Sequence, residues 1–374
     1  MKILFVVNEA KFFLSHRLPI AEEASSRGYE VMVACGEGTG EQKLVALNIK
    51  YRTLPLSRSG INPMEELRTF RTLLKIYREE RPDLVHHITI KPVLYGTAAA
   101  RWSKVPAVVN AVPGMGFIFT RRGQIAALRR SFVNLGYRIA LSHSNMRVIF
   151  QNIEDMRGFL GHAIIGRHQA ALIRGAGVDL NLFRSTPEPA GHITFVLVAR
   201  MLRDKGVREF AEAAEIVKEQ YPDWRFRLVG EVDPGNPSSL CKEEIDAWQT
   251  RGVVEWLGQR DDVELVIAAA HVVCLPSYGG EGLPKALLEG AASGRAMIAS
   301  DIPGCREVVR DEVTGITVPP RDAKALAQAM LRLGEDPPLR ARFGRSARQK
   351  AEAVFSVEDV VRHTFLVYEE LLAT

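Results

Sequence analysis

The chain has 374 residues, of which 47% are hydrophobic and 25% are charged, the composition of a globular protein rather than a disordered or membrane-spanning one. This length allows two domains of ordinary size. The four cysteines are widely spaced and include no C-x-x-C, so we expect neither a disulfide framework nor a zinc site, and a reducing cytoplasm fits. No apolar run is long enough to span a membrane, and the run after Lys2 is too short for a signal peptide.

Charge is distributed unevenly along the chain. Residues 1–187 hold 26 Lys and Arg against 14 Asp and Glu, a balance of +12, whereas residues 188–374 hold 23 against 30, a balance of −7. No acidic residue occurs from Leu84 to Ile153, a stretch with nine basic ones. A field of one sign points to an anionic partner: a phospholipid surface, a pyrophosphate-bearing substrate or nucleic acid. No nucleic-acid-binding motif accompanies the charge, so we expect no nucleic acid.

The first half alternates between strand and helix patterns. Strands are expected over residues 2–7, 29–35, 83–88, 107–112 and 147–150, and helices over 18–28 and 63–82. In the second of these helices, apolar residues at 67, 70, 73, 74 and 77 share one face, and Pro82 ends it. Strands that alternate with helices predict a parallel sheet covered on both faces.

The second half starts the same pattern again. Strands are expected over residues 193–201, 226–230, 253–258, 272–276 and 296–300, and helices over 206–222, 239–250, 263–270, after Glu281, and over 323–336. A segment with two prolines and a glycine, 184–192, separates the halves. We therefore predict an α/β fold with domains at 1–187 and 188–355, and a C-terminal helix, 356–374, that packs back on the first domain.

Two doubly wound domains should bind ligands at the carboxyl ends of their strands. In the segment SYGGEGLPKALLEGAASG (277–294), Glu281 lies in a glycine-rich loop and Glu289 one to two turns into the following helix, with Pro284 suited to its first turn. Free amides at this helix start make an anion site. A sugar nucleotide has the matching shape, because hydroxyls flank its diphosphate at both ends.

The matching cations, Arg200 and Lys205, follow the first strand of the second domain in ARMLRDKG. Positioned cations stabilise the charge of a departing nucleoside diphosphate. The chain has no D-x-D, so these cations would replace a metal ion, and no G-x-G-x-x-G for a dinucleotide cofactor. Structural alternatives remain: Glu281 as a capping acid, Glu289 as a solvated helix residue, and ion pairs of the two cations with Asp204 or Glu209.

Residues 281–330, from EGLPKALLEG onward, together with ARMLRDKG and GAGVDLNLF (175–183), resemble family 4 of the retaining, nucleotide-sugar glycosyltransferases, which have the GT-B fold of two Rossmann-like domains around a cleft. The resemblance implies that Glu281 binds the donor sugar, Glu289 the ribose, and Arg200 and Lys205 the diphosphate. The other donor contacts it implies are Gly230, Gly280, Gly282, Leu283 and, for uracil through the backbone, Gln259 and Arg260.

The N-terminal half resembles a narrower branch, in FFLSHRLPIA, DLVHHITIKPVLYGTAAAR, VNAVPGMGFIF and VIFQNIEDM. Bacterial enzymes of this branch extend O-antigen, capsule or N-glycan precursors by moving an N-acetylhexosamine from a UDP-sugar to a polyprenyl-pyrophosphate-linked saccharide. PGMG replaces the histidine of the wider family, so a catalytic residue is sought instead among His86, His87 and Lys91, or His16. The acceptor is expected at His16, Gly114, Met115, Gly116, Arg121 and Arg122.

The implied reaction retains the anomeric configuration: the acceptor hydroxyl attacks from the face that the diphosphate leaves, and the departing phosphate takes its proton. Neither cofactor nor metal is expected. The basic stretch 117–150, rich in Phe, Leu and Ile, is expected to rest on the anionic inner leaflet, which makes the enzyme cytoplasmic and peripheral. Two alternatives are a UDP-sugar 2-epimerase, which needs no basic face, and a non-catalytic scaffold of a polysaccharide assembly complex.

Overall fold

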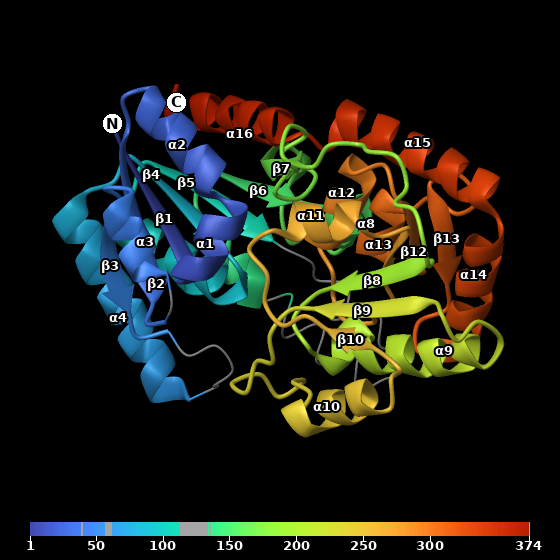
Figure 1. Ribbon diagram of the computed structural model, residues 1–374. Helices are drawn as coiled ribbons and strands as arrows, with labels where there is room; N and C mark the ends of the chain where they lie inside the picture. Colours follow the sequence, from blue (N-terminus) through green and yellow to red (C-terminus); the bar gives the residue numbers. More distant parts are fainter. Residues whose placement is uncertain (39, 57–61, 113–133, 135, 374) are drawn as a thin grey trace. The chain divides into compact units, whose positions relative to one another are not determined.

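A computed structural model describes residues 1–374 except 39, 57–61, 113–133, 135 and 374. The chain divides into two compact units (Figure 1), the first comprising residues 1–176 and 358–374 and the second 177–357. The chain thus passes between the units twice, at 176/177 and at 357/358. The first of these points lies N-terminal to the boundary at 187/188 that the proline-containing segment predicts.

The first unit is a seven-stranded parallel sheet in the order β3-β2-β1-β4-β5-β6-β7, as far as the described residues go. Its strands are β1 (Lys2–Glu9), β2 (Glu30–Gly36), β3 (Lys50–Leu54), β4 (Leu84–Ile88), β5 (Ala107–Val112), β6 (Met146–Phe150) and β7 (Ala170–Leu172). Its helices are α1 (Ala10–His16), α2 (Leu18–Ser26), α3 (Glu41–Ala46), α4 (Pro63–Glu80), α5 (Thr97–Trp102), α8 (Ile153–Gly161) and α16 (Val357–Leu372), with a π-helix at Pro92–Gly96 and a 3₁₀ turn at Arg167–Gln169.

Strand β1 shows why this sheet is covered on both sides. Successive side chains of a strand point to opposite faces. Ile3, Phe5 and Val7 accordingly join one apolar cluster, and Leu4 and Val6 join the other. The first cluster also contains Phe365 and Tyr368 of α16, so the C-terminal helix (red in Figure 1) completes the core of the first unit.

The second unit is a six-stranded parallel sheet in the order β10-β9-β8-β11-β12-β13. Its strands are β8 (Thr194–Val198), β9 (Arg225–Val229), β10 (Glu255–Trp256), β11 (Val272–Leu275), β12 (Ala296–Ser300) and β13 (Gly315–Val318). Its helices are α9 (Val207–Gln220), α10 (Lys242–Thr250), α11 (Val263–Ala268), α12 (Lys285–Ala292), α13 (Pro303–Val308), α14 (Ala323–Glu335) and α15 (Pro337–Val354), with a 3₁₀ turn at Arg203–Lys205.

Both sheets are doubly wound, as the alternating pattern predicts. The strand order reverses between β1 and β4 in the first unit and between β8 and β11 in the second. Ligands of such sheets bind outside the carboxyl ends of the strands at this reversal. Among the described residues, no helix combines the length and apolar character required to cross a bilayer.

Candidate functional site

The predicted donor residues of the second unit follow the two strands at the reversal. Arg200 and Lys205 come after β8, and Glu281 comes after β11, its neighbour in the sheet. The loop after β8 turns through Gly206, whose φ of +74° is left-handed. A Cβ at Gly206 would lie 2.2 Å from the Pro276 carbonyl oxygen, so glycine lets this loop approach the end of β11.

Backbone hydrogen bonds hold the two loops together. The Asp204 carbonyl oxygen accepts from the amides of Tyr278 (2.9 Å) and Gly279 (3.1 Å), and the Ser277 hydroxyl oxygen lies 2.8 Å from it. A Cβ at Gly279 would lie 3.1 Å from the Asp204 carboxylate, so this contact also favours glycine. The loop that carries Glu281 is therefore fixed against the loop that carries Lys205.

Lys205 and Glu281 contact each other directly. The Lys205 ammonium donates to Glu281 Oε1 at 2.6 Å, and the Ser277 hydroxyl lies 2.6 Å from the same oxygen. The Glu281 side chain is 10% exposed. Arg200 donates instead to Asp233, at 2.5 Å. The two cations therefore pair with carboxylates other than Asp204 and Glu209, the partners that a purely local ion-pair interpretation had considered.

Helix α12 begins one residue later than expected, because Pro284 is its N-cap rather than part of its first turn. Glu281 precedes the cap and does not cap the helix itself. Glu289 is 5% exposed, so it is not the solvated helix residue of the structural alternative. Burial raises the pKa of its carboxyl, and the ammonium of Lys285, 3.4 Å away, opposes that shift.

Glycines also permit close backbone contacts elsewhere at the carboxyl ends of the strands in the second sheet. Gly230 has a φ of +141°, and a Cβ there would lie 1.9 Å from the Ala199 carbonyl oxygen, so the ends of β8 and β9 meet closely. A Cβ at Gly304 would lie 2.5 Å from the carbonyl oxygens of Glu281 and Gly282, which places the start of α13 against the loop. Leu283 is buried and Gly280 is exposed.

The predicted nucleobase contacts, Gln259 and Arg260, are both exposed and follow β10. The Arg260 guanidinium donates two hydrogen bonds to the Asp262 carboxylate, at 2.7 and 2.6 Å. These hydrogen bonds raise the pKa of Arg260 and lower that of Asp262. A base contact at this place would accordingly involve the backbone rather than a free guanidinium.

His86 and His87 lie inside the first unit. Strand β4 extends through both residues to Ile88, so they occupy mid-strand positions rather than a strand end, and they are 1% and 0% exposed. His86 Nδ1 shares a hydrogen bond of 2.6 Å with the Tyr368 hydroxyl. Burial depresses the pKa of His86 well below its usual value. This core position does not support the expectation that His86 is catalytic.

His87 is equally enclosed, on the opposite face of the sheet. Its Nε2 lies 2.8 Å from the Tyr77 hydroxyl, and its Nδ1 lies 2.8 Å from Asn110 Oδ1. A Cβ at Gly96 would lie 2.5 Å from the imidazole, so the ring packs directly on the π-helix. Burial lowers the pKa of His87 to about 4. These contacts give His87 a structural role and likewise do not support a catalytic one.

The remaining predicted residues of the first unit are nearer its surface. Lys91 donates to the Glu66 carboxylate at 2.6 Å. His16 is half-buried, stacks on the Phe12 ring with centroids 4.1 Å apart, and shares a hydrogen bond with Ser15. The other predicted acceptor residues, namely Gly114, Met115, Gly116, Arg121 and Arg122, lie outside the described residues.

Three residues of the second unit also build this site: Asp204, which sequence reasoning named only as an ion-pair partner, and Asp233 and Ser277, which it missed. Asp204 is next to Lys205, and Ser277 precedes Glu281 by four residues, so nearness to a predicted residue was the available signal for both. Asp233 offers no such signal, because only the pairing of β8 with β9 brings it to Arg200. No group of His, Cys, Asp and Glu side chains suited to a metal ion occurs in the described part of the chain.

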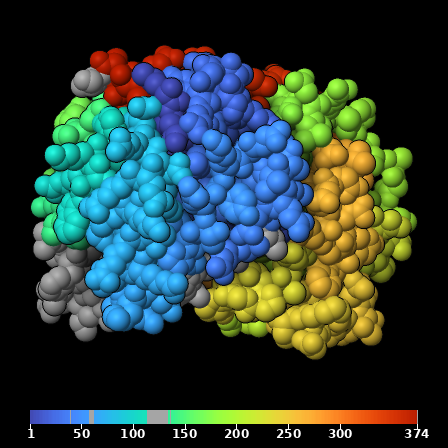
Figure 2. Space-filling view, turned by 90° about the vertical axis from the view of Figure 1, so that its left-hand side faces the viewer, coloured from blue at the N-terminus to red at the C-terminus, as the bar shows by residue number. Residues whose placement is uncertain are grey.

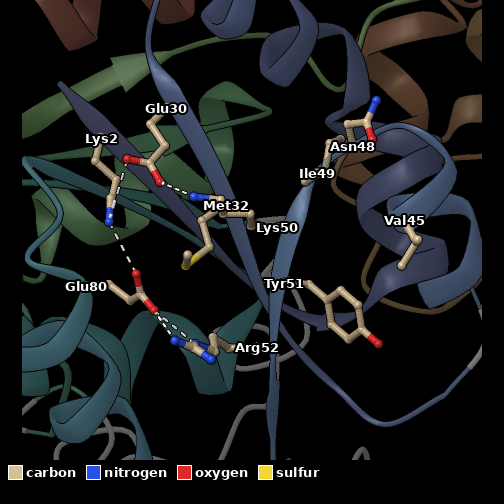
Figure 3. A pocket seen from close by; sticks show the side chains of 10 residues that line it. All are labelled: Lys2, Glu30, Met32, Val45, Asn48, Ile49, Lys50, Tyr51, Arg52 and Glu80. Carbon is tan, nitrogen blue, oxygen red and sulfur yellow. Dashed lines mark hydrogen bonds and ion pairs between the residues drawn. The ribbon is translucent and has the colours of Figure 1, made fainter.

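A pocket of about 580 Å³ opens at the other end of the first sheet (Figure 3), where β1, β2 and β3 begin. Its charged groups pair with one another. Glu30 accepts from Lys50 at 2.9 Å, and Glu80 accepts from Lys2 at 3.2 Å and from Arg52. The pocket contains no predicted site residue, and it lies at the amino ends of the strands, away from the edge where doubly wound sheets bind ligands.

Comparison with known families agrees with this geometry. Residues 192–336 match the family described as glycosyl transferases group 1, and residues 2–152 match the glycosyl transferase 4-like family. Each match covers most of one sheet, and together they span most of the chain.

Two curated relatives resemble the chain over most of their length. N,N'-diacetylbacillosaminyl-diphospho-undecaprenol alpha-1,3-N-acetylgalactosaminyltransferase of Campylobacter jejuni is 28% identical, with 100% of this chain and 99% of that protein covered. UDP-Gal:alpha-D-GlcNAc-diphosphoundecaprenol alpha-1,3-galactosyltransferase of Escherichia coli is 25% identical, with 82% of this chain and 81% of that protein covered.

Solved structures share the fold. A glycosyltransferase from Rickettsia africae superposes with a TM-score of 0.78 at 20% identity, with 99% of this chain and 98% of that chain covered. The Anabaena protein HepE in complex with UDP superposes with a TM-score of 0.77 at 20% identity, with 99% and 100% covered. The chain therefore belongs to the group 1 and 4-like glycosyltransferases, and it is a glycosyltransferase of the GT-B fold.

Proposed function

We propose that this glycosyltransferase moves an N-acetylhexosamine from a UDP-sugar to a saccharide linked to polyprenyl pyrophosphate, in the synthesis of a cell-surface polysaccharide or glycan precursor. The contact between Lys205 and Glu281 carries the proposal, because it joins a cation and a carboxylate from the two loops at the reversal of the second sheet. The names of the Campylobacter and Escherichia relatives, both transferases acting on diphospho-undecaprenol saccharides, supply the acceptor class.

The donor diphosphate lies at the start of α12, where backbone amides and the helix dipole favour an anion. Lys205 adds positive charge there. An ammonium carries three hydrogens, so Lys205 can donate to a phosphate oxygen while it keeps its contact with Glu281. Arg200 donates hydrogen bonds to the phosphate either in place of Asp233 or together with it, because a guanidinium can donate five hydrogen bonds.

Glu281 accepts hydrogen bonds from hydroxyls of the donor sugar, and Glu289 accepts from the ribose diol. Transfer proceeds with retention: the acceptor hydroxyl attacks from the face that the diphosphate leaves, and the departing phosphate oxygen takes the proton. Lys205, Arg200 and the α12 amides stabilise the charge that develops on the leaving group, so the reaction needs no metal ion. No enzymic base is then obligatory, which agrees with the core positions of His86 and His87.

The first unit supplies the contact with the membrane, at the inner face of the cytoplasmic membrane. The stretch predicted for this contact, 117–150, lies in large part outside the described residues, which lack 117–133 and 135. The described surface that fits this contact runs along α4 and the end of α5 (light blue to teal in Figure 2), where apolar and basic residues are exposed. Trp102 is 68% exposed beside Phe70, and Leu67 is exposed one turn before Phe70. The basic members of this surface are Arg68, Arg71, Arg101 and Lys104. Each basic residue near anionic lipid contributes about 1 kcal/mol.

The decisive experiment incubates the full chain with radiolabelled UDP-sugars and a synthetic polyprenyl-pyrophosphate saccharide. We expect label on the lipid, an α-linkage when the donor is α, and unchanged turnover after chelator treatment. An isomerised donor would indicate the epimerase instead, no turnover with any UDP-sugar would indicate a scaffold, and turnover lost to the chelator and restored by a divalent cation would contradict the metal-free mechanism.

Vesicle binding tests the membrane contact separately. We expect the chain to pellet with phosphatidylglycerol vesicles and not with phosphatidylcholine vesicles, and expect binding to weaken as salt rises. Replacement of Arg68 and Arg71 by glutamate should reduce binding, whereas the same change at Arg225 and Arg251 of the second unit should not. Equal binding to both kinds of vesicle would contradict an electrostatic contact.

A further inference from the structure

The loop that carries Glu281 is rich in glycine and has few large side chains to hold it. Residues 277–282 read SYGGEG, so three of the six are glycines and Tyr278 is the only large side chain. Glycine-rich segments are free to adopt many backbone conformations, and that freedom must be removed before such a loop can bind a ligand tightly. The backbone bonds of Tyr278 and Gly279 to Asp204 fix one end of the loop. The Glu281 carboxylate, bound by Lys205 and Ser277, is a second anchor, and the Tyr278 ring offers a third.

Arg321 lies over that ring. Its guanidinium carbon is 4.3 Å from the centroid of the Tyr278 ring, the geometry of a cation–π contact. Among the described residues Arg321 forms no ion pair, in contrast to Arg200 and Lys205. The contact with the aromatic ring is therefore the main interaction of the Arg321 side chain.

The backbone around Arg321 is restrained. Arg321 follows Pro319 and Pro320 after β13, and the next residue, Asp322, caps α14 by accepting from the Ala325 amide at 2.9 Å. Arg321 itself has a φ of +63°, which side-chain-bearing residues adopt only when the surroundings require it. Two prolines, a cap and a residue with positive φ thus restrain the backbone at Arg321, although its side chain is exposed and, among the described residues, only the ring contact places the guanidinium.

The contact approaches the loop from the side of α9 and α14. Burial, and after it the charge of Glu209 in the first turn of α9, raises the pKa of Tyr278. Burial also raises the pKa of Glu209, and the charge of Arg321 acts to lower it, whereas Glu281 leads into α12. Helices α9 and α12 pack against different apolar clusters of the second sheet. The ring therefore meets the loop from the side of α9, while the Glu281 carboxylate is held by Lys205 and Ser277.

We propose that Arg321 and Tyr278 are positioning residues for the donor. The guanidinium holds the Tyr278 ring, and the ring holds Gly279–Gly282 so that Glu281 and the start of α12 meet the donor diphosphate in one arrangement. This inference rests on the proposed function, because it concerns the same donor site. It assigns no contact with the substrate to either side chain.

The test titrates UDP, GDP, CDP and ADP into the full chain by calorimetry and continues with the nucleotide that the wild type binds. Arg321→Ala and Tyr278→Ala should each raise its Kd about fivefold, the loss expected for one partly exposed cation–π contact. Arg321→Lys and Tyr278→Phe keep a cation and a ring, and should stay within about twofold of wild type. In turnover, the donor KM should rise by the same factor while kcat holds.

Arg342 provides the matched control, because its guanidinium lies 5.0 Å from the Phe343 ring in the same unit, on α15. Arg342→Ala should leave nucleotide affinity unchanged. The double variant Arg321→Ala/Tyr278→Ala should bind no more weakly than either single variant, since the two side chains act as one unit. Effects that multiply in the double variant, or single variants with wild-type affinity, would overturn the inference.

Lys205→Ala separates this inference from the proposed function. If Lys205→Ala weakens nucleotide binding and Arg321→Ala does not, only the positioning role is wrong. If Lys205→Ala leaves affinity unchanged, or the wild type binds none of the four nucleotides, the proposed donor site is wrong and the inference is overturned with it. Thermal midpoints of all variants within a few degrees of wild type show that affinity changes do not come from unfolding.

Discussion

Strand β4 of the first unit and the loops after β8 and β11 of the second place ionisable side chains in opposite situations. His86 and His87 lie within a strand, so each imidazole enters a core and loses its charge. Lys205 and Glu281 lie just past their strands, keep partial exposure, and meet as an ion pair. In two sheets with the same order of strand reversal, ionisable groups within a strand are thus buried and neutral, whereas those past its carboxyl end remain charged and paired.

A shift of a few residues along a strand therefore separates a side chain with a structural role from one that can contact a ligand. Within a covered parallel sheet an ionisable group is stable only when neutral and hydrogen-bonded. Beyond the carboxyl end, charges from adjacent strands can pair with each other and with a ligand.

Removing the charge of Glu281 or Lys205 should cost the most activity. We expect Glu281→Gln and Lys205→Ala to lower kcat/KM about 10²–10³-fold, the loss typical of one preorganised electrostatic contact with the transition state. Transfer of labelled sugar to the lipid acceptor measures it. The control is Arg251→Ala, which breaks the Arg251–Glu215 pair, 2.7 Å, in the same unit and should act like wild type. Loss of less than tenfold in both site variants would contradict their proposed roles.

His87 should make folding sensitive to acid. Its pKa is 6.5 when unfolded and about 4 when folded, so between these values the unfolded chain binds a proton that the folded chain does not. Stability therefore falls as the pH drops below 6.5 and levels off near 4, by about 3 kcal/mol from this residue. Urea denaturation between pH 7.5 and 4 measures the slope, and His87→Gln should lose that part of it. An identical slope in the variant would mean that the pKa of His87 is the same in the folded and the unfolded chain.

The alternation of strands and helices could be predicted because long apolar runs and one-sided helices leave a clear pattern in sequence. Strand β3 leaves little pattern: only Leu54 of its five residues is buried, since it is at the edge of the sheet. Helix α15 was also missed, because besides Leu339 and Phe343 it buries mainly small residues such as Ala347 and Ala351, and its other positions are largely basic. Short edge strands and alanine-faced helices bury too little apolar surface to be recognised.

The site could be predicted in its residue types but not in its pairing. Lys205 and Glu281 are 76 residues apart, and only the adjacency of β8 and β11 makes them partners. The strand predicted over 83–88 already contained His86 and His87, but the sequence could not show that both side chains turn into the covered faces of the sheet. The hydrogen bonds from Tyr77, Asn110 and Tyr368 that make burial of the two rings tolerable come from distant segments.

A methyl group at Gly206 should disturb the charged loops without changing a charge. Gly206→Ala places a Cβ 2.2 Å from the Pro276 carbonyl oxygen, so the Lys205 loop must move away from the end of β11. We expect the donor KM to rise about tenfold, near 1.4 kcal/mol. Gly252→Ala is the matched control: its φ of +69° is similar, but nothing lies within 4 Å of the added carbon. It should cost about 1 kcal/mol of stability and no donor affinity. Equal donor KM values in the two variants would mean that close packing of the loops is unimportant.

Arg260 should give the smallest effect, although it too follows a strand. Its guanidinium is exposed and already donates both of its hydrogen bonds of 2.7 and 2.6 Å to Asp262. If the nucleobase binds to the backbone here, Arg260→Ala should change the Kd of the bound nucleotide less than about twofold, because exposed ion pairs contribute little. Calorimetry beside Lys205→Ala measures the contrast. A tenfold loss of nucleotide affinity in Arg260→Ala would show that the guanidinium leaves Asp262 to bind the nucleotide. The position of a charged residue just after a strand would then predict ligand binding better than the ion pair it forms without ligand.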